Sequence, residues 1–564
     1  MSQVACPAPS GFTWRVHTPD SPCASSPSSA CSSTSTANRP QRYEGFDGYA
    51  REVTTSVPEA QAWFDQGIQL MYGFNHDEAI RSFQAATEVD PSCAMAWWGI
   101  SYANGLDINN PMISEAEAKL AYDAAQTALS LKDTASPVER ALIEAGGARY
   151  AWPNPEDRVY LDEAYAERMG AAFRAFPRDA DVGALYAESL MNLQAWDYWT
   201  KDGSPVKRIT EIVATLEHVM GLSPEHPGAN HFYIHAVEAS STPERAEASA
   251  DRLRDMVPGS GHLVHMPSHI YVRIGRYADA AKANVLAIDA DKRYFAKAPA
   301  PDFYSLYYVH NIHFLGYASM MEGRSEVAMR AARQLESEMP ASFAQNYMPM
   351  ADGFLAMPFQ VMVRFGQWSE ILEEPQPSEE RKLSRAMWSA ARGLAFAALG
   401  RTEEARAEQL VFERAASEVP EGWTMGLNPA ADILAIARRM LDGEILYREG
   451  RLDEAYAALR DAVAKEDALT YDEPPGWMMP TRHALGALLM GGDRFAEAEA
   501  VYRDDLAKQP NNGWGLLGLE RALSSLGRHA EVETVRVARE AAWKRADVAP
   551  TSSCYCEPAV VLTD

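Results

Sequence analysis

The sequence predicts an all-α fold in which pairs of antiparallel helices repeat along the chain. From Glu59 onward, apolar residues recur at helical spacing within long stretches rich in Ala, Leu and Glu. Similar Gly-Arg turns interrupt these stretches, as at positions 275–276, 400–401 and 450–451. No stretch shows a convincing strand pattern. We therefore expect a long array of helices rather than a sheet.

The stretch from Ala60 to Cys93 shows the repeat most clearly. It carries a bulky anchor, a small residue for close helix contact, core-filling residues and a terminating proline, which are Trp63, Gly67, Leu70, Ala79, Phe83, Ala86 and Pro91. Further pairs follow the same frame: Gly393 with Ala405, Gly443 with Ala455, Gly486 with Ala498, Tyr502 and Pro510, and Trp514 with Gly518 and Ala530. This pattern resembles the tetratricopeptide repeat (TPR) family, whose period is 34 residues. The resemblance covers most of residues 55–545.

The resemblance implies a TPR-like right-handed superhelical solenoid of antiparallel helix pairs, with a concave groove lined by the first helix of each pair. Members of that family are usually peptide-binding scaffolds, but a fold alone does not assign a function. We expect three regions: a disordered Ser/Thr/Pro-rich tail at 1–45, the α-solenoid at 46–545, and a flexible Cys-containing tail at 546–564. The histidine-rich part of the solenoid spans 226–317.

Composition excludes several classes of protein. The chain carries 78 acidic against 52 basic residues, a formal charge of −26, so it has no basic field to hold nucleic acid. No apolar run approaches the roughly 20 residues needed to cross a bilayer. Only Cys93 of the six cysteines lies inside the repeats, so disulfides do not build the fold. We expect a cytoplasmic protein, with organelle targeting by the N-terminal tail as the alternative.

Histidines depart from the pattern of an ordinary scaffold. Nine of the 13 lie between His218 and His313. The pairs His231/His235 and His265/His269 each have a four-residue spacing, which places both members on one helix face. The two pairs are 34 residues apart, one full repeat, and the pair His310/His313 repeats His262/His265 after a 14-residue insertion. By analogy with the family, these positions face the groove, so seven histidines should gather in one patch: His231, His235, His262, His265, His269, His310 and His313.

A metal ion explains such a cluster best, because neutral imidazole is the commonest metal ligand whereas neighbouring imidazoles repel one another once protonated. The alternative is a set of ordinary groove residues bonded to neighbours or water. Imidazole binds copper, zinc and iron well. Few carboxylates fall at the repeat positions that carry the histidines, which argues against metals that prefer oxygen ligands. The ligand set is chemically similar to dinuclear copper centres that handle dioxygen, although no motif of those proteins is present. We therefore expect copper, with zinc and iron as alternatives.

Three carboxylates are candidate acids or bases near the histidines. Glu238 follows His231 by seven residues, Glu188 falls at a groove position of the preceding helix pair, and Asp302 lies in the insertion. Each could act as ligand, as partner of a ligand, or as general base, and Glu238 could equally be a solvated charge. The insertion at 293–306 contains four aromatic residues that either cover a substrate or form a packed loop.

The sequence favours a copper oxidoreductase that acts on a small molecule in the groove. One alternative is a scaffold that binds a peptide or protein partner, although a histidine patch lacks the basic and amide groups that grip carboxylates. Further alternatives are a zinc hydrolase and a protein of metal storage or delivery. In the last case Cys554 and Cys556 would bind a soft ion; otherwise they have no part in function.

Overall fold

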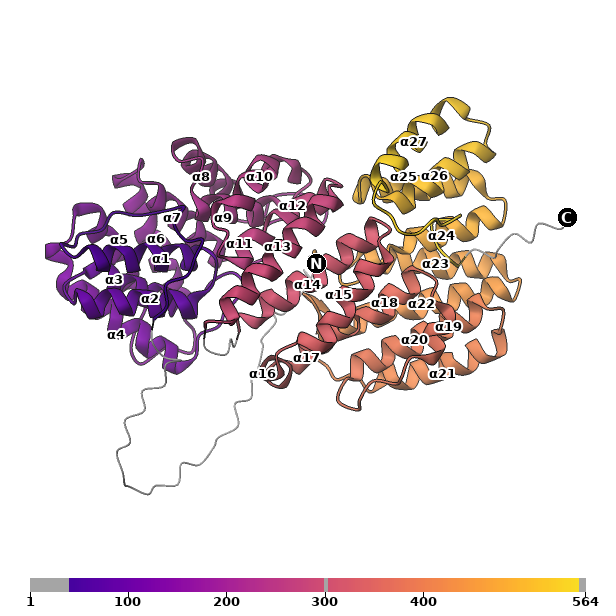
Figure 1. Ribbon diagram of the computed structural model, residues 1–564, viewed down its shortest axis with the longest axis horizontal. Coiled ribbons are helices and arrows are strands. Elements are labelled where there is room, and N and C mark those ends of the chain that lie inside the picture. Colours follow the sequence, from indigo (N-terminus) through magenta and orange to yellow (C-terminus); the bar gives the residue numbers. More distant parts are fainter. Residues whose placement is uncertain (1–39, 299–302, 557–564) are drawn as a thin grey trace, which may run out of the picture.

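The computed structural model describes residues 40–298 and 303–556, and within them the chain is all-α apart from one short hairpin. The predicted solenoid of antiparallel helix pairs is confirmed. Helices that follow one another in sequence lie side by side, and a single apolar core runs through most of the array. In Figure 1 the N-terminal helices occupy one end, the C-terminal helices occupy the other, and α13, α14 and α15 lie between them.

The helices of the N-terminal half are α1 (Pro58–Tyr72), α2 (His76–Val89), α3 (Ala94–Ala103), α4 (Glu115–Leu131), α5 (Pro137–Ala148), α6 (Val159–Ala175), α7 (Ala180–Asn192), α8 (Ile209–Leu222), α9 (Pro227–Val237), α10 (Glu247–Met256), α11 (Gly261–His265), α12 (Pro267–Arg273) and α13 (Tyr277–Phe295). Short 3-10 turns lie at η2 (Lys132–Thr134) and η3 (Pro243–Ala246).

The helices of the C-terminal half are α14 (Ser305–Met321), α15 (Ser325–Glu338), α16 (Ala341–Asn346), α17 (Met348–Leu355), α18 (Met357–Arg364), α19 (Trp368–Glu373), α20 (Lys382–Ala398), α21 (Thr402–Ser417), α22 (Ala430–Arg448), α23 (Leu452–Asp467), α24 (Thr481–Gly491), α25 (Phe495–Lys508), α26 (Gly513–Ser525) and α27 (His529–Ala542). The hairpin pairs β1 (Thr424–Met425) with β2 (Asn428–Pro429).

Glycine and an aromatic ring form the same packing unit at both ends of the array. A Cβ added to Gly67 or Gly99 would lie 2.6 or 2.7 Å from the ring of Phe83. At the other end, a Cβ added to Gly486 or Gly518 would lie 2.4 or 2.1 Å from the ring of Tyr502. In each case the aromatic residue of a second helix fits against glycines of the first helices before and after it. This unit explains why the repeat needs a small residue and a ring in that spacing.

The Gly-Arg turns have a backbone reason. Gly400 and Gly450 have φ of +75° and +78°, in the left-handed region that side chains disfavour, and no atom lies within 4 Å of an added Cβ. At these two turns the glycine is therefore required by the turn itself and not by crowding. At Gly275, φ is +78° and an added Cβ would also lie 2.3 Å from the Pro510 carbonyl oxygen.

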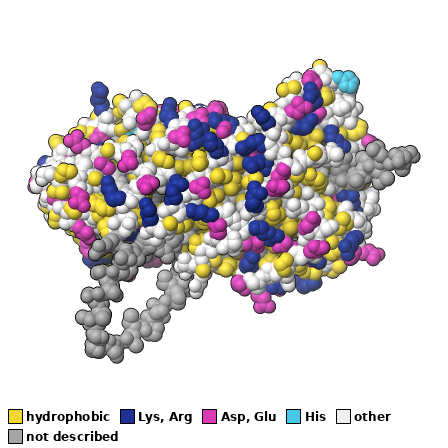
Figure 2. All heavy atoms as spheres, viewed as in Figure 1, with side chains coloured by type: hydrophobic (Ala, Val, Ile, Leu, Met, Phe, Trp, Pro, Cys, Tyr) yellow, Lys and Arg dark blue, Asp and Glu magenta, His cyan; other side chains and the backbone are white. Residues whose placement is uncertain are grey.

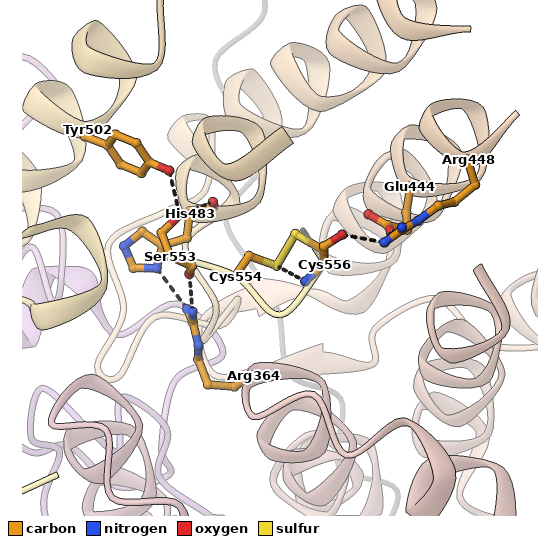
Figure 3. Close-up of a disulfide and its surroundings, with 8 residues drawn as sticks. All are labelled: Arg364, Glu444, Arg448, His483, Tyr502, Ser553, Cys554 and Cys556. Carbon is orange, nitrogen blue, oxygen red and sulfur yellow. Dashed lines mark hydrogen bonds and ion pairs between the residues drawn. A yellow bond between two sulfur atoms is a disulfide. The ribbon is translucent and has the colours of Figure 1, made fainter. Parts of the chain in front are cut away.

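The described part of the C-terminal segment, residues 546–556, contacts several helices (Figure 3). Asp547 accepts hydrogen bonds from the backbone N–H groups of Ser325 and Glu326 at the start of α15. The guanidinium of Arg364 donates to the Ser553 carbonyl and to His483 Nδ1, and a disulfide joins Cys554 to Cys556. His483 is thus part of a separate polar network in the C-terminal half.

The surface mixes charges of both signs. Acidic and basic side chains are interspersed over the face drawn in Figure 2, and histidine is nearly absent from it. Within the described ranges, no helix combines the length and the apolar character that spanning a bilayer would need. The clustered histidines lie inside the array.

Candidate metal centre

Four helices of the middle of the array supply the clustered histidines. Helix α9 carries His231 and His235, α11 carries His262 and His265, α12 carries His269, and α14 carries His310 and His313. The predicted single helix around His265 is divided at Met266, because Pro267 begins α12 and has no N–H to continue the hydrogen-bond ladder. His265 and His269 remain neighbours across this division, with ring centroids 4.7 Å apart.

Six histidines form two groups of three. In the first triad, His231, His235 and His262 offer ring nitrogens that all lie within 4.8 Å of one another, and the Nε2 atoms of His231 and His262 are 3.1 Å apart. In the second triad, His265, His269 and His310 meet the same limit, and the Nε2 atoms of His265 and His269 are 2.7 Å apart. The triads adjoin: the ring centroids of His235 and His269 are 5.7 Å apart.

Glu238 links the two triads. Its carboxylate accepts from His235 Nδ1 at 2.9 Å and from His269 Nδ1 at 2.7 Å. A second carboxylate, that of Glu473, also contacts His269 Nδ1. Both carboxylates are buried, so they hold the two rings without competition from water.

The hydrogen-bond partners fix which nitrogen carries the proton in four of the six rings. His231 Nδ1 lies 2.7 Å from the carbonyl oxygen of Tyr72, which can only accept. His265 Nδ1 lies 2.7 Å from the side-chain oxygen of Asn284, whose amide nitrogen donates to Ala280. His235 and His269 donate to Glu238 in the same way. When these rings are neutral, Nε2 therefore keeps its lone pair, which is the form that binds metal.

Burial favours the neutral form of most of these rings. It lowers the pKa of His235 to about 3 and lowers the pKa values of His231, His262, His265 and His310 well below the usual range of histidine. His269 differs. Burial opposes its charge, but the carboxylates of Glu473 and Glu238 outweigh burial and raise the pKa of His269 to about 10. Without a metal, His269 is the ring that holds an extra proton.

Aromatic rings enclose the centre. The ring of Phe74 lies 4.6 Å from that of His231, Trp196 lies 5.3 Å from His235, and Tyr307 lies 4.4 Å from His262. Phe314 stacks on His269 at 5.5 Å. Two hollows in the described surface, of about 270 and 710 Å³, have no histidine in their walls. The partly exposed ring of His310 marks the most accessible side of the six-histidine cluster.

The remaining predicted residues lie apart from the two triads. His313 is buried against Phe354, with ring centroids 5.1 Å apart, and neither of its nitrogens has a partner among the described residues. Glu188 lies on α7 beside Asn192. Asp302 lies outside the described residues. Of the aromatic insertion, Tyr294 and Tyr304 are buried and contact each other, which indicates packing for its described part.

Sequence reasoning missed several partners of the histidines. Glu473 lies in a Pro-rich stretch before α24, and nothing in the sequence indicates that it contacts α12. The Tyr72 carbonyl is a backbone group with no side-chain signal. Asn284 faces α11 from α13 and could have been found from the helix-pair register, since paired helices contact each other.

Comparisons with known proteins add little to this description. No family model matches the chain, and no curated protein matches it. Solved structures with some likeness include the human IFIT1 dimer with m7Gppp-AAAA, at 11% identity and a TM-score of 0.31, covering 88% of this chain and 92% of that one. The human IFIT1 dimer with PPP-AAAA has 11% identity and a TM-score of 0.29, covering 89% and 97%. At this level of similarity the likeness carries no information about ligands.

Proposed function

We propose that the two histidine triads bind two copper ions and that the protein is an oxidoreductase acting on a small molecule. The observation that carries the proposal is the convergence of the Nε2 atoms of His265 and His269, 2.7 Å apart. When both rings are neutral, each presents a lone pair to the other, because their Nδ1 protons are committed to Asn284 and Glu238. Two lone pairs at this distance repel unless a cation lies between or beside them; in the metal-free protein that cation is the extra proton of His269, which a bound metal ion would displace.

The first triad also brings ring nitrogens close together. The Nε2 atoms of His231 and His262 are 3.1 Å apart, and His235 Nε2 is buried with no partner among the described residues. Leaving a buried nitrogen unpaired costs about 1–3 kcal/mol, and a metal ion removes this cost by accepting the lone pair. Two sites with the same three-imidazole ligand set lie side by side, which supports a dinuclear centre.

The ligand set favours copper. All six donors are imidazoles, and the two adjacent carboxylates, Glu238 and Glu473, already contact the Nδ1 atoms of the rings. Imidazole sites bind Cu²⁺ more tightly than Zn²⁺ or Fe²⁺. Bound copper would supply one-electron chemistry and reaction with dioxygen. Zinc, in a hydrolase, would use the same ligands and is an outcome that the experiment below distinguishes.

The residues of the chain would act by orientation and by exclusion of water. Glu238 and the Tyr72 carbonyl hold the rings in one tautomer, so that Nε2 faces the centre. Phe74, Trp196 and Phe314 cover the other sides of the rings. The buried setting selects a small reactant, since His310 alone among the six histidines is partly exposed.

The test is metal analysis of the full-length protein purified without a histidine tag and loaded with Cu(I) in the absence of oxygen. We expect two coppers per chain, retained during gel filtration, and oxygen consumption when reductant is added. Binding of zinc alone would replace the oxidoreductase by a hydrolase. Two coppers that support no turnover would indicate storage or delivery, and failure to bind any metal would leave a peptide-binding scaffold.

A matched variant tests the linking role of Glu238. Replacing the carboxylate in Glu238→Gln leaves one oxygen to accept from two rings, so the affinity for both ions should fall about 10- to 100-fold. Glu444→Gln removes another buried carboxylate, in the C-terminal half (Figure 3), and should leave metal affinity unchanged. Equal affinities of the wild type and Glu238→Gln would contradict the proposed ligand arrangement.

A further inference from the structure

The disulfide of the C-terminal segment joins two cysteines of a single turn. It links Cys554 to Cys556, two positions apart in the sequence (Figure 3). A disulfide stabilises a fold chiefly by closing a loop of the unfolded chain, and the gain grows with the length of that loop. This bridge encloses only one residue and connects no two helices. Its stabilising effect on the fold as a whole is therefore small, and another role is expected.

The turn that the disulfide closes supplies backbone acceptors to two arginines. Arg364 is 4% exposed and donates to the Ser553 carbonyl at 2.5 Å and to His483 Nδ1 at 2.9 Å. Its Nε has no partner among the described residues. Arg448 donates to the Cys556 carbonyl. The conformation of this turn therefore decides whether a buried guanidinium keeps its backbone acceptor.

The same segment is docked by side chains. The Ser553 hydroxyl donates to the His483 carbonyl at 2.7 Å and lies 2.7 Å from the Tyr502 hydroxyl. Tyr555 packs closely on Gly366, where an added Cβ would lie 2.6 Å from the Tyr555 Cβ. The segment thus connects α24 and α25 with the turn between α18 and α19, and the disulfide lies inside this docked stretch.

The two cysteines differ in exposure and in hydrogen bonding. Cys554 is partly exposed, whereas Cys556 is 5% exposed. The Cys556 backbone N–H donates to Cys554 Sγ at 3.2 Å. Such a bond favours a thiolate at Cys554 once the pair is reduced. An accessible cysteine with a supported thiolate, next to a less accessible partner, is the arrangement of a pair that exchanges with external thiols.

We propose that Cys554 and Cys556 form a reversible thiol–disulfide exchange site for small thiols such as glutathione, and that reduction of this pair releases the C-terminal segment from α18 and α22. The site is separate from the histidine triads, and the proposal does not depend on copper.

Reduction takes two steps. The thiolate of an external thiol attacks Cys554 Sγ, the bond between the two cysteines breaks, and Cys556 leaves as a thiolate that takes up a proton. A second external thiolate then attacks the external sulfur of the mixed disulfide and releases Cys554. Two external thiols are oxidised to one disulfide, and the pair gains two electrons and two protons. Oxidation follows the same steps in reverse, with Cys556 as the resolving thiolate.

Release follows from the loss of the closed ring. Once the two sulfur atoms separate, the turn gains backbone freedom, and holding it in the docked conformation costs conformational entropy. The Ser553 and Cys556 carbonyls then leave Arg364 and Arg448. The helices themselves stay in place, because α22 pairs with α23 and α24 pairs with α25 without the segment.

The experiment equilibrates the metal-free, full-length protein with reduced and oxidised glutathione at a series of ratios and then labels free thiols with iodoacetamide for increasing times. Trypsin cuts after Arg545, so residues 546–564 form one peptide that contains Cys554, Cys556 and no other cysteine. Mass spectrometry should show this peptide unlabelled at low ratios of reduced glutathione and doubly labelled at high ratios, with a single glutathione adduct between them.

Cys93 is the internal reference, because it is fully buried in the N-terminal half and burial raises the pKa of its thiol. In the reduced protein Cys556 should be labelled about tenfold faster than Cys93 or more, since the released segment no longer covers it. In Cys554→Ser no bridge can form, so Cys556 should be labelled rapidly even without reductant. Serine at the three N-terminal cysteines should leave the titration unchanged (Cys6, Cys23 and Cys31).

Four results would overturn the proposal. If the peptide stays unlabelled in excess reduced glutathione, the disulfide is structural. If it is fully labelled even in oxidised glutathione, the pair does not form a disulfide. If Cys556 of the reduced protein is labelled as slowly as Cys93, the segment stays docked. If Cys93 is labelled as rapidly as Cys556, the whole fold opens and no segment is released.

Discussion

Glu473, in the loop before α24, contacts Nδ1 of His269 on α12, 204 residues earlier in the chain. The same nitrogen also contacts Glu238. The histidine centre is therefore completed by the C-terminal half of the array and not only by the helices that carry the histidines. A role for Glu473 should be visible at the second triad, which contains His269, and not at the first.

Glu473→Gln should weaken metal binding to the second triad by about tenfold, because the buried negative charge that supports His269 is lost. The measurement is competition with a chelator in two backgrounds. In His231→Ala/His262→Ala, which retains the second triad, Glu473→Gln should lower the affinity. In His265→Ala/His269→Ala, which retains the first triad, it should have no effect. Equal losses in both backgrounds would show that Glu473 acts on the fold.

The two triads should lose metal independently. His265→Ala/His269→Ala removes two of the three ligands of one triad and should reduce copper from two ions to one per chain, with helical circular dichroism nearly unchanged. His313→Ala is the matched control, because His313 is also buried on α14 but contacts Phe354 instead of either triad. It should retain two ions. Loss of one copper ion in His313→Ala would show that His313 is a metal ligand after all.

Glycine–aromatic packing predicts opposite effects of two alanine substitutions. In Gly518→Ala the new Cβ would lie 2.1 Å from the buried ring of Tyr502, so the free energy of unfolding should fall by about 1–3 kcal/mol. In Gly221→Ala, near the end of α8, no atom lies within 4 Å of the Cβ, and the better helix former should stabilise by up to about 1 kcal/mol. Urea denaturation of the two variants measures both changes.

The repeat made the fold and much of the histidine cluster predictable. Because successive helix pairs are packed in the same way, residues 34 positions apart, such as His231 and His265, occupy equivalent positions on neighbouring pairs. In the structure these two rings lie in adjoining triads. The same reasoning assumes that the first helix of every pair turns the same face towards the groove. Helix α14 does not: it presents His310 to the second triad and His313 to Phe354.

Contacts outside the repeat register were not predictable. The contact between Glu473 and His269 depends on how the C-terminal helices pack against the middle of the array. That packing is a property of the whole solenoid and not of any one repeat. The Tyr72 carbonyl, which accepts from His231, is a backbone group and leaves no mark in the sequence. Glu188 was a candidate acid or base only because it falls at a groove position of the helix pair that precedes the histidines.

Asp291 on α13 predicts a pH dependence of stability in the metal-free protein. The Tyr304 hydroxyl and the Asn311 amide donate to its carboxyl group, yet burial dominates and raises the pKa of Asp291 to about 7. In the unfolded chain the pKa is about 3.9, so between about pH 4 and 7 the unfolded state releases a proton that the folded state keeps. The free energy of unfolding should therefore fall as the pH rises, by on the order of 4 kcal/mol.

Asp291→Asn removes the ionisation while keeping one acceptor for Asn311 and one donor for the Tyr304 oxygen. Relative to the wild type, this variant should gain stability steadily from about pH 4 to pH 7 in urea denaturation and level off above pH 7. Asp289→Asn alters an exposed carboxylate of the same helix and should follow the wild type at every pH. A constant difference between Asp291→Asn and the wild type across this range would mean that Asp291 is already ionised in the folded protein at low pH.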